Sequence, residues 1–213
     1  MVPERVFFFD CDKTLYDYDF RKRLPALSRL TGVSQYRLAK QWWVGGHEAA
    51  ANIGEYPTSD DYLAVFAEVT GYPLSLEEWR EARAAAMTPV PGVLATLARA
   101  ATLGTVSLLS NNPIPFRDSF AQLAPEAAAL LGENDLVSAV LGAEKPEPRV
   151  YTRALSRYGV APDRTMLIDD SAANCAGAEA VGMHAFQLTK DASGAFDVAG
   201  LDAAVDAFVA ATP

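Results

Sequence analysis

The sequence predicts an α/β fold in which a parallel sheet is covered by helices on both faces and carries an inserted block of helices after its first strand. Two patterns support this prediction. Short apolar runs alternate with helical patterns in the second half of the chain, whereas the region after the first apolar run shows helical periodicity only. The chain has 213 residues, half of them hydrophobic, which suits one domain with a modest insertion.

The first predicted strand covers residues 5–9 and is almost entirely apolar, as is typical of a strand buried on both faces. A helical block follows over residues 16–87. Its predicted helices show apolar stripes at helical spacing, polar residues at their starts or glycines at their ends. They cover residues 20–31, 34–42, 59–71 and 75–87.

The second half of the chain alternates between helix and strand patterns. The predicted elements are a helix at 92–101, a strand at 105–110 followed by a helix and loop, a weaker strand at 136–141, a helix at 149–158, a strand at 165–168, a helix at 173–181, a strand at 184–188 and a helix at 201–211. This order predicts a Rossmann-like sheet with helices on both faces. The α/β core then combines residues 1–15 and 88–213, and 16–87 is an all-helical insertion.

Polar side chains stand where the predicted strands end. In open parallel sheets, ligands bind beyond the carboxyl ends of the strands, so these side chains are expected to meet at one edge. They are Asp10 and Asp12 after the first strand, Ser110 and Asn111 after the second, Lys145 after the weaker strand, and Asp169 and Asp170 after the strand at 165–168.

The first pair of acids suggests metal-assisted chemistry. Asp10 and Asp12 alternate along an extended chain and so lie on the same side, where they repel each other unless a cation sits between them. Mg²⁺ prefers oxygen ligands and accepts one or two carboxylates together with phosphate and water. We expect Asp10 and Asp170 to be its carboxylate ligands, with the backbone carbonyl of Asp12 as a further ligand.

The same set of residues predicts phosphoryl transfer through an aspartyl-phosphate. Asp10 is the expected nucleophile, and Asp12 the group that protonates the leaving oxygen and then deprotonates the attacking water. Ser110, with Asn111 beside it, is expected to hold phosphate oxygens. Lys145 would neutralise the charge on Asp10 and the phosphoryl group.

Four motifs in order resemble those of the haloacid dehalogenase superfamily of phosphohydrolases, and the resemblance covers essentially the whole chain. They are Asp10-Cys11-Asp12-Lys13-Thr14, Ser110, Lys145 in Glu144-Lys145-Pro146, and Ile168-Asp169-Asp170-Ser171-Ala172-Ala173-Asn174. The resemblance implies supporting roles for Thr14, Asp169 and Asn174. It also implies that block 16–87 is the small helical cap of that family, which closes over the site and selects the substrate.

Within the superfamily the chain looks most like the bacterial sugar-phosphate phosphatases that act on glucose 1-phosphate. Shared segments include Tyr18-Asp19-Phe20 and Lys145-Pro146-Glu147. A pyrimidine or other nucleoside monophosphate 5′-nucleotidase is the main alternative. A 2-haloacid dehalogenase needs neither Mg²⁺ nor an acid at the position of Asp12, so Asp12 argues against it. The complete motif set argues against a non-catalytic binding protein.

Four aromatic or imidazole side chains outside the motifs are candidates for substrate contact. Tyr16 and Tyr18 lie at the hinge between core and cap, and Trp42 and His47 lie in the cap. The alternatives are that Trp42 belongs to the core of the cap and that His47 is an ordinary surface or core histidine.

Composition narrows the partners. The net charge of −9 and the lack of a basic patch argue against nucleic acid, and no apolar stretch is long enough to span a bilayer. The only cysteines, Cys11 and Cys175, are far apart and have no zinc-ligand spacing, which suggests reduced, packed thiols and a cytoplasmic location. The expected partner is a small phosphorylated metabolite, handled by a monomer or homodimer.

Overall fold

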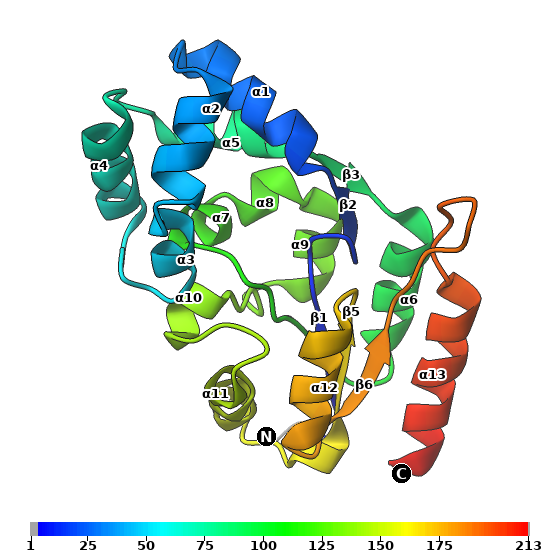
Figure 1. Cartoon of the computed structure of the whole chain (residues 1–213). Helices are drawn as coiled ribbons and strands as arrows, with labels where there is room; N and C mark the ends of the chain where they lie inside the picture. The colour runs from blue at the N-terminus through cyan, green and yellow to red at the C-terminus, as the bar shows by residue number, and fades with distance from the viewer. Residues whose placement is uncertain (1–3, 213) are drawn as a thin grey trace.

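The computed structural model describes residues 4–212. Its four main strands are β1 (Val6–Phe9), β4 (Thr105–Leu108), β5 (Thr165–Asp169) and β6 (His184–Gln187). They form one sheet in the order β4-β1-β5-β6, and every neighbouring pair runs parallel (Figure 1). The α/β fold with a parallel sheet, predicted from the sequence, is confirmed.

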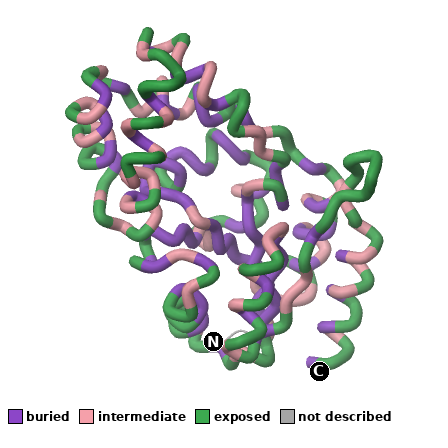
Figure 2. Tube along the Cα trace, in the orientation of Figure 1, coloured by how far each residue is buried: buried purple, intermediate pink, exposed green. Residues whose placement is uncertain are grey.

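Helices cover both faces of this sheet. They are α6 (Pro91–Ala100), α9 (Pro125–Leu131), α11 (Pro148–Tyr158), α12 (Ala172–Ala180) and α13 (Val198–Ala211). Phe7 and Phe9 of β1 pack in a cluster with α6, α9 and α13, whereas Phe8 packs in a second cluster with α11 and α12. Figure 1 shows α6 with α13 and α11 with α12 on opposite sides of the strands. Strands β1, β4 and β5 are buried almost throughout, as this double cover requires, whereas the edge strand β6 is partly exposed (Figure 2).

The chain leaves the sheet after β1 through a two-stranded antiparallel ribbon. Strand β2 (Tyr16–Tyr18) pairs with β3 (Met87–Pro89), so the two ends of the helical block lie side by side. We did not expect this ribbon, because both strands are only three residues long. The elements between them are α1 (Phe20–Thr31), α2 (Gln35–Leu38), the π-helix η1 (Ala39–Trp43), α3 (His47–Asn52), α4 (Ser59–Thr70) and α5 (Leu76–Ala84).

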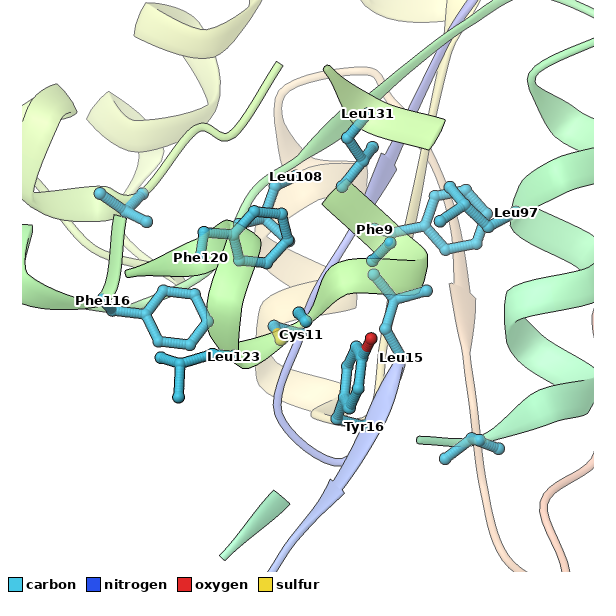
Figure 3. Close-up of a cluster of buried hydrophobic side chains, with 14 of the residues drawn as sticks. Phe9, Cys11, Leu15, Tyr16, Leu97, Leu108, Phe116, Phe120, Leu123 and Leu131 are labelled. Atoms are coloured by element: carbon cyan, nitrogen blue, oxygen red, sulfur yellow. The ribbon is translucent and has the colours of Figure 1, made fainter. Parts of the chain in front are cut away.

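Residues 16–87, the block predicted to be a cap and called the cap below, rest on two short helices, α7 (Ile114–Asp118) and α8 (Phe120–Leu123). Helix α4 contacts α7, and α5 contacts both. Buried apolar side chains of the cap and of the sheet consequently belong to one continuous cluster. Figure 3 shows part of it, including Cys11 and, from these helices, Phe116, Phe120 and Leu123.

The prediction of a weaker strand at 136–141 is wrong for most of this segment. The segment runs beside β4 only briefly: the Ser110 backbone N–H donates to the Leu136 carbonyl, and Val137 forms an isolated parallel bridge with Ser110. From Ser138 the chain is helical, as α10 (Ser138–Leu141). A short apolar run fits a buried helical turn as well as a buried strand, and periodicity does not distinguish the two.

Two predicted helices also differ from the structure. The helix predicted at 34–42 begins at its Ser34 cap but widens into the π-helix η1, and the helix predicted at 75–87 ends at Ala84.

No helix among residues 4–212 is long and apolar enough to cross a membrane.

Candidate active site

The register of the sheet brings the predicted residues to one edge. Phe9 pairs with Leu108 on one side and with Ile168 on the other. The residues that follow these positions therefore leave the sheet together, and the Asp10 backbone N–H donates to the Ile168 carbonyl. As a result, Asp10 lies beside the ends of β4 and β5.

Lys145 lies at the centre of this edge and is buried. Its Nζ donates to Asp10 Oδ1 at 3.0 Å, to Asp169 Oδ2 at 2.5 Å and to the Leu109 carbonyl at 2.6 Å. Burial works against the charge of Lys145, but the two carboxylates outweigh it and hold its pKa above the usual value. The ammonium thus stays charged beside Asp10, as the charge-neutralising role requires.

Asp10 is the most perturbed carboxyl group in the site. Burial raises its pKa most, Lys145 opposes the rise, and Asp169 and Asp12 add to it, so that the pKa reaches about 7. Burial and Asp169 also raise the pKa of Asp170. Several acids thus share a region that one lysine only partly neutralises, and a further cation would favour their ionised forms.

The spacing of the carboxylate oxygens suits such a cation. One carboxylate oxygen from each of Asp10, Asp169 and Asp170 lies within 4.8 Å of the others. An all-oxygen donor set suits Mg²⁺. Asp169 is fully buried, and its oxygens already accept from Lys145, from the Ser171 backbone N–H at 2.9 Å and from Asn174 Nδ2 at 2.9 Å. This arrangement favours Asp10 and Asp170 as ligands and leaves Asp169 as the residue that orients the group.

Asp12 faces a different partner. Both of its carboxylate oxygens accept from Arg83 Nη2, at 2.7 and 2.6 Å. Arg83 lies in α5 of the cap and is buried. Sequence analysis did not single it out, because an arginine in an amphipathic helix carries no signal of a contact 71 residues away.

Asn111 lines the cavity next to Ser110, as the predicted phosphate contact requires, and also holds the backbone of Lys145. Its Nδ2 donates to the Lys145 carbonyl at 2.8 Å, and its Oδ1 accepts from the Lys145 backbone N–H at 2.9 Å. These two bonds hold the loop of Lys145 in place and leave a second N–H of the carboxamide for another acceptor. Ser110 Oγ accepts from Asn112 Nδ2 at 2.9 Å, and Ser110 faces the same cavity as Asp10.

Two adjoining cavities open at this edge. The first, of about 260 Å³, is lined by the predicted catalytic and metal-binding residues, among them Asp10, Asp12 and Lys145. The second, of about 470 Å³, lies between the hinge and the loop after β6. The larger cavity is less suited to hold the reacting phosphate, because neither Asp10 nor Lys145 lines it. The two share Lys13, Tyr18 and Asp170.

Of the four predicted substrate contacts, only Tyr18 lines these cavities. Trp42 is fully buried inside the cap, where its Nε1 donates to Glu48, so it cannot reach a substrate in this structure. Tyr16 is also buried, as Figure 3 shows, and its hydroxyl donates to Glu126 at 2.6 Å. His47 stacks on Trp42 and lines neither cavity. A helical pattern does not reveal which aromatic side chains face a cleft.

Three further side chains in or next to the motifs are buried. Thr14 is fully buried. Burial raises the pKa of the Cys11 thiol well above its usual value, and that of Cys175 to about 12, so both stay neutral thiols and pack as small apolar groups.

The fold and this set of strand-end residues define the chain as a haloacid dehalogenase-like hydrolase. The model of that family matches residues 4–182, so the chain belongs to it, and the resemblance inferred from the four motifs is confirmed. Among curated proteins, the chain is 27% identical to Phosphatase MT3486 of Mycobacterium tuberculosis (strain CDC 1551 / Oshkosh) over 189 residues. That match covers 85% of this chain and 86% of the other.

Two solved structures illustrate the shared fold. The HAD family enzyme BT-2542 from Bacteroides thetaiotaomicron, in complex with magnesium and inorganic phosphate, superposes with a TM-score of 0.74 at 20% identity, covering 89% of this chain and 97% of that one. The 2-haloacid dehalogenase from Pseudomonas syringae pv. Tomato DC3000 has a TM-score of 0.65 at 20% identity, covering 96% and 99%. A fold shared by a magnesium- and phosphate-bound enzyme and a 2-haloacid dehalogenase does not specify the reaction, so the site residues must distinguish a phosphatase from a dehalogenase.

Proposed function

We propose that this hydrolase is a Mg²⁺-dependent phosphatase of small phosphorylated metabolites, with sugar phosphates favoured, acting through an aspartyl-phosphate. The observation that carries the proposal is the joint position of Asp10 and Asp12. Asp10 contacts Lys145 and the acid cluster, while Asp12 opens onto the same cavity with its carboxylate held by a different cation.

In the first step, a carboxylate oxygen of Asp10 attacks phosphorus and the ester P–O bond breaks. Lys145 stays charged beside Asp10 and offsets the negative charge that accumulates there. Ser110 is placed to hold a phosphate oxygen, because it lines the cavity next to Asp10.

Asp12 handles the proton. It donates to the departing ester oxygen, which becomes an alcohol, and in the second step it takes a proton from the water that attacks phosphorus and breaks the bond to Asp10. Both steps use one group in opposite directions, so Asp12 returns to its starting state.

Asp10 and Asp170 are the carboxylates that would hold Mg²⁺, with the Asp12 backbone carbonyl as a predicted third ligand. When bound, the ion offsets repulsion between the carboxylate and the phosphate dianion. Asp169, fixed by Lys145 and Asn174, orients this group.

The sizes of the two cavities support the proposal that the substrate is a small molecule. The two cavities share Tyr18; the larger, of about 470 Å³, lies within the range of small-molecule sites, and the adjoining one, of about 260 Å³, lies just below it. We expect the cap, residues 16–87, to select the substrate.

MT3486 is itself named a phosphatase, which agrees with the proposed reaction. The buried, unpaired Cys11 and Cys175 agree with the expected cytoplasmic location.

Release of inorganic phosphate from sugar phosphates and nucleoside monophosphates, and of halide from 2-haloacids, tests the proposal. We expect Mg²⁺-dependent turnover of sugar phosphates that stops in excess EDTA and is abolished in Asp10→Asn. Asp163→Asn, at an exposed position, is the matched control. A strong preference for nucleoside monophosphates would replace the sugar with a nucleotide substrate, and halide release in EDTA would contradict the phosphatase assignment.

A further inference from the structure

Arg83 makes a close side-chain contact between the cap and the predicted catalytic edge of the sheet. It lies near the end of α5, and its side chain is 2% exposed. Its Nη2 contacts both oxygens of Asp12 and also donates to Asn112 Oδ1 at 3.2 Å. One cap side chain thus joins the proposed proton shuttle to a core loop.

Two aromatic rings fix the guanidinium in place. The Arg83 Cζ lies 4.2 Å from the centroid of the Tyr18 ring and 4.9 Å from that of Phe116. Tyr18 belongs to the hinge strand β2, and Phe116 to α7 of the core. The charged group therefore sits where cap, hinge and core meet, at distances at which a cation is attracted to a ring face.

Arg83 lines neither cavity, so its contact with the substrate region passes through Asp12. A carboxylate at the end of a strand would otherwise be free to rotate, because Asp12 keeps 24% of its side chain exposed. Contact of both oxygens with one nitrogen removes that freedom while leaving the carboxylate open to the cavity.

We propose that Arg83 is a positioning residue that holds the carboxylate of Asp12 over the cleft when the cap rests on the core. The inference rests on the proposed function, in which Asp12 is the proton shuttle. If Arg83 aligns Asp12, that alignment depends on the position of the cap. Asp12 then delivers its proton efficiently only when the cap covers the cleft.

Leaving groups of different basicity test this role. A 4-nitrophenolate departs without a proton, whereas an alkoxide from an alkyl or sugar phosphate needs one. The ratio kcat/KM reports the steps up to leaving-group departure, so later hydrolysis of the aspartyl-phosphate does not affect it. We expect Arg83→Met to lower kcat/KM about 100-fold for the alkyl ester and less than about 10-fold for 4-nitrophenyl phosphate.

Arg23→Met is the matched control. Arg23 is also a buried cap arginine, but it pairs with Glu48 inside the cap at 3.1 Å. Damage to the cap alone should lower kcat/KM for both esters by the same factor. Arg83→Lys keeps the charge and should recover part of the alkyl-ester activity, and it carries the test if Arg83→Met does not fold.

Asp12→Asn separates the two hypotheses. If Asp12→Asn discriminates between the esters and both Arg83 variants lose activity equally on each, the positioning role is wrong while the proposed function stands. If Asp12→Asn itself shows no discrimination, the assignment of Asp12 as proton shuttle fails, and the role of Arg83 fails with it.

Discussion

The buried ion pair inside the cap gives the sharpest prediction on stability. Glu48 accepts from Arg23 Nη1 at 3.1 Å, from Trp42 Nε1 at 2.6 Å and from the Tyr62 hydroxyl at 2.7 Å. The side chains of Arg23 and Glu48 are only 5% and 13% exposed. Replacing Glu48 by Ala would leave a buried guanidinium and two buried donors without this acceptor.

The size of the loss follows from these contacts. Removing one partner of a buried ion pair costs about 3–5 kcal/mol, and each orphaned donor adds about 1 kcal/mol or more. We therefore expect Glu48→Ala to lower the free energy of unfolding by at least about 5 kcal/mol. Glu48→Gln can still accept a hydrogen bond, so its loss should be nearer about 2 kcal/mol.

Urea denaturation, followed by tryptophan fluorescence, measures both losses. Glu81→Gln is the matched control, because Glu81 pairs with Arg29 at 3.7 Å with both side chains more than half exposed. Its change should stay below about 1 kcal/mol. If Glu48→Gln were as stable as Glu81→Gln, the buried pair would not stabilise the cap and the reasoning would be refuted.

The ion pair between Arg23 and Glu48 also predicts that the free energy of unfolding depends on pH. Burial works against ionisation of Glu48, but Arg23 and the hydrogen bonds from Trp42 and Tyr62 outweigh it and hold the pKa of Glu48 below its usual 4.5. The contribution to stability is therefore complete above pH 4.5 and is lost as the pH falls through the lower, folded-state pKa. Below pH 4.5 the wild type should lose stability more steeply than Glu48→Gln.

Three further predictions concern the active site. Asp10→Asn should abolish phosphate release, because an amide is not a nucleophile, while phosphate binding measured by calorimetry persists. Asn174→Ala should lower kcat and Mg²⁺ affinity about 10–100-fold, because Asp169 loses a hydrogen bond that orients it; Mg²⁺ titration of activity measures both. Tyr18→Ala should raise KM, whereas Trp42→Phe should change stability and leave KM within about twofold, because only Tyr18 lines the cavities.

Each has an outcome that would contradict it. Residual turnover in Asp10→Asn would exclude Asp10 as nucleophile. Unchanged Mg²⁺ affinity in Asn174→Ala would show that Asp169 needs no such support. An increase in KM for Trp42→Phe equal to that for Tyr18→Ala would place Trp42 at the cleft after all.

The sheet and the strand-end residues could be predicted because their signals are local. The apolar run of β1 and the two acids after it are adjacent in the chain, and the carboxyl ends of parallel strands meet wherever such a sheet forms. Asp10, Lys145 and Asp169 were therefore expected to gather at one edge, and the structure brings them into contact.

The segment at 136–141 and the contacts of Asn111 could not be predicted in the same way. Whether a short apolar run extends the sheet depends on how far a neighbouring strand continues, and here the pairing beside β4 ends near Ser110. Likewise, the sequence does not show which loop an asparagine after a strand will hold. Asn111 bonds to the backbone of Lys145, 34 residues away, and also lines the cavity.

The sequence by itself determined the family, the sheet and the order of the catalytic motifs, because these depend on periodicity and on residues that are neighbours in the chain. Only the tertiary structure decided how the cap meets the core: that Trp42 packs inward, that Tyr18 faces the cavities and that Arg83 holds Asp12. The physical reason is that an amphipathic pattern shows which face of a helix is buried, while its partner depends on how distant elements pack.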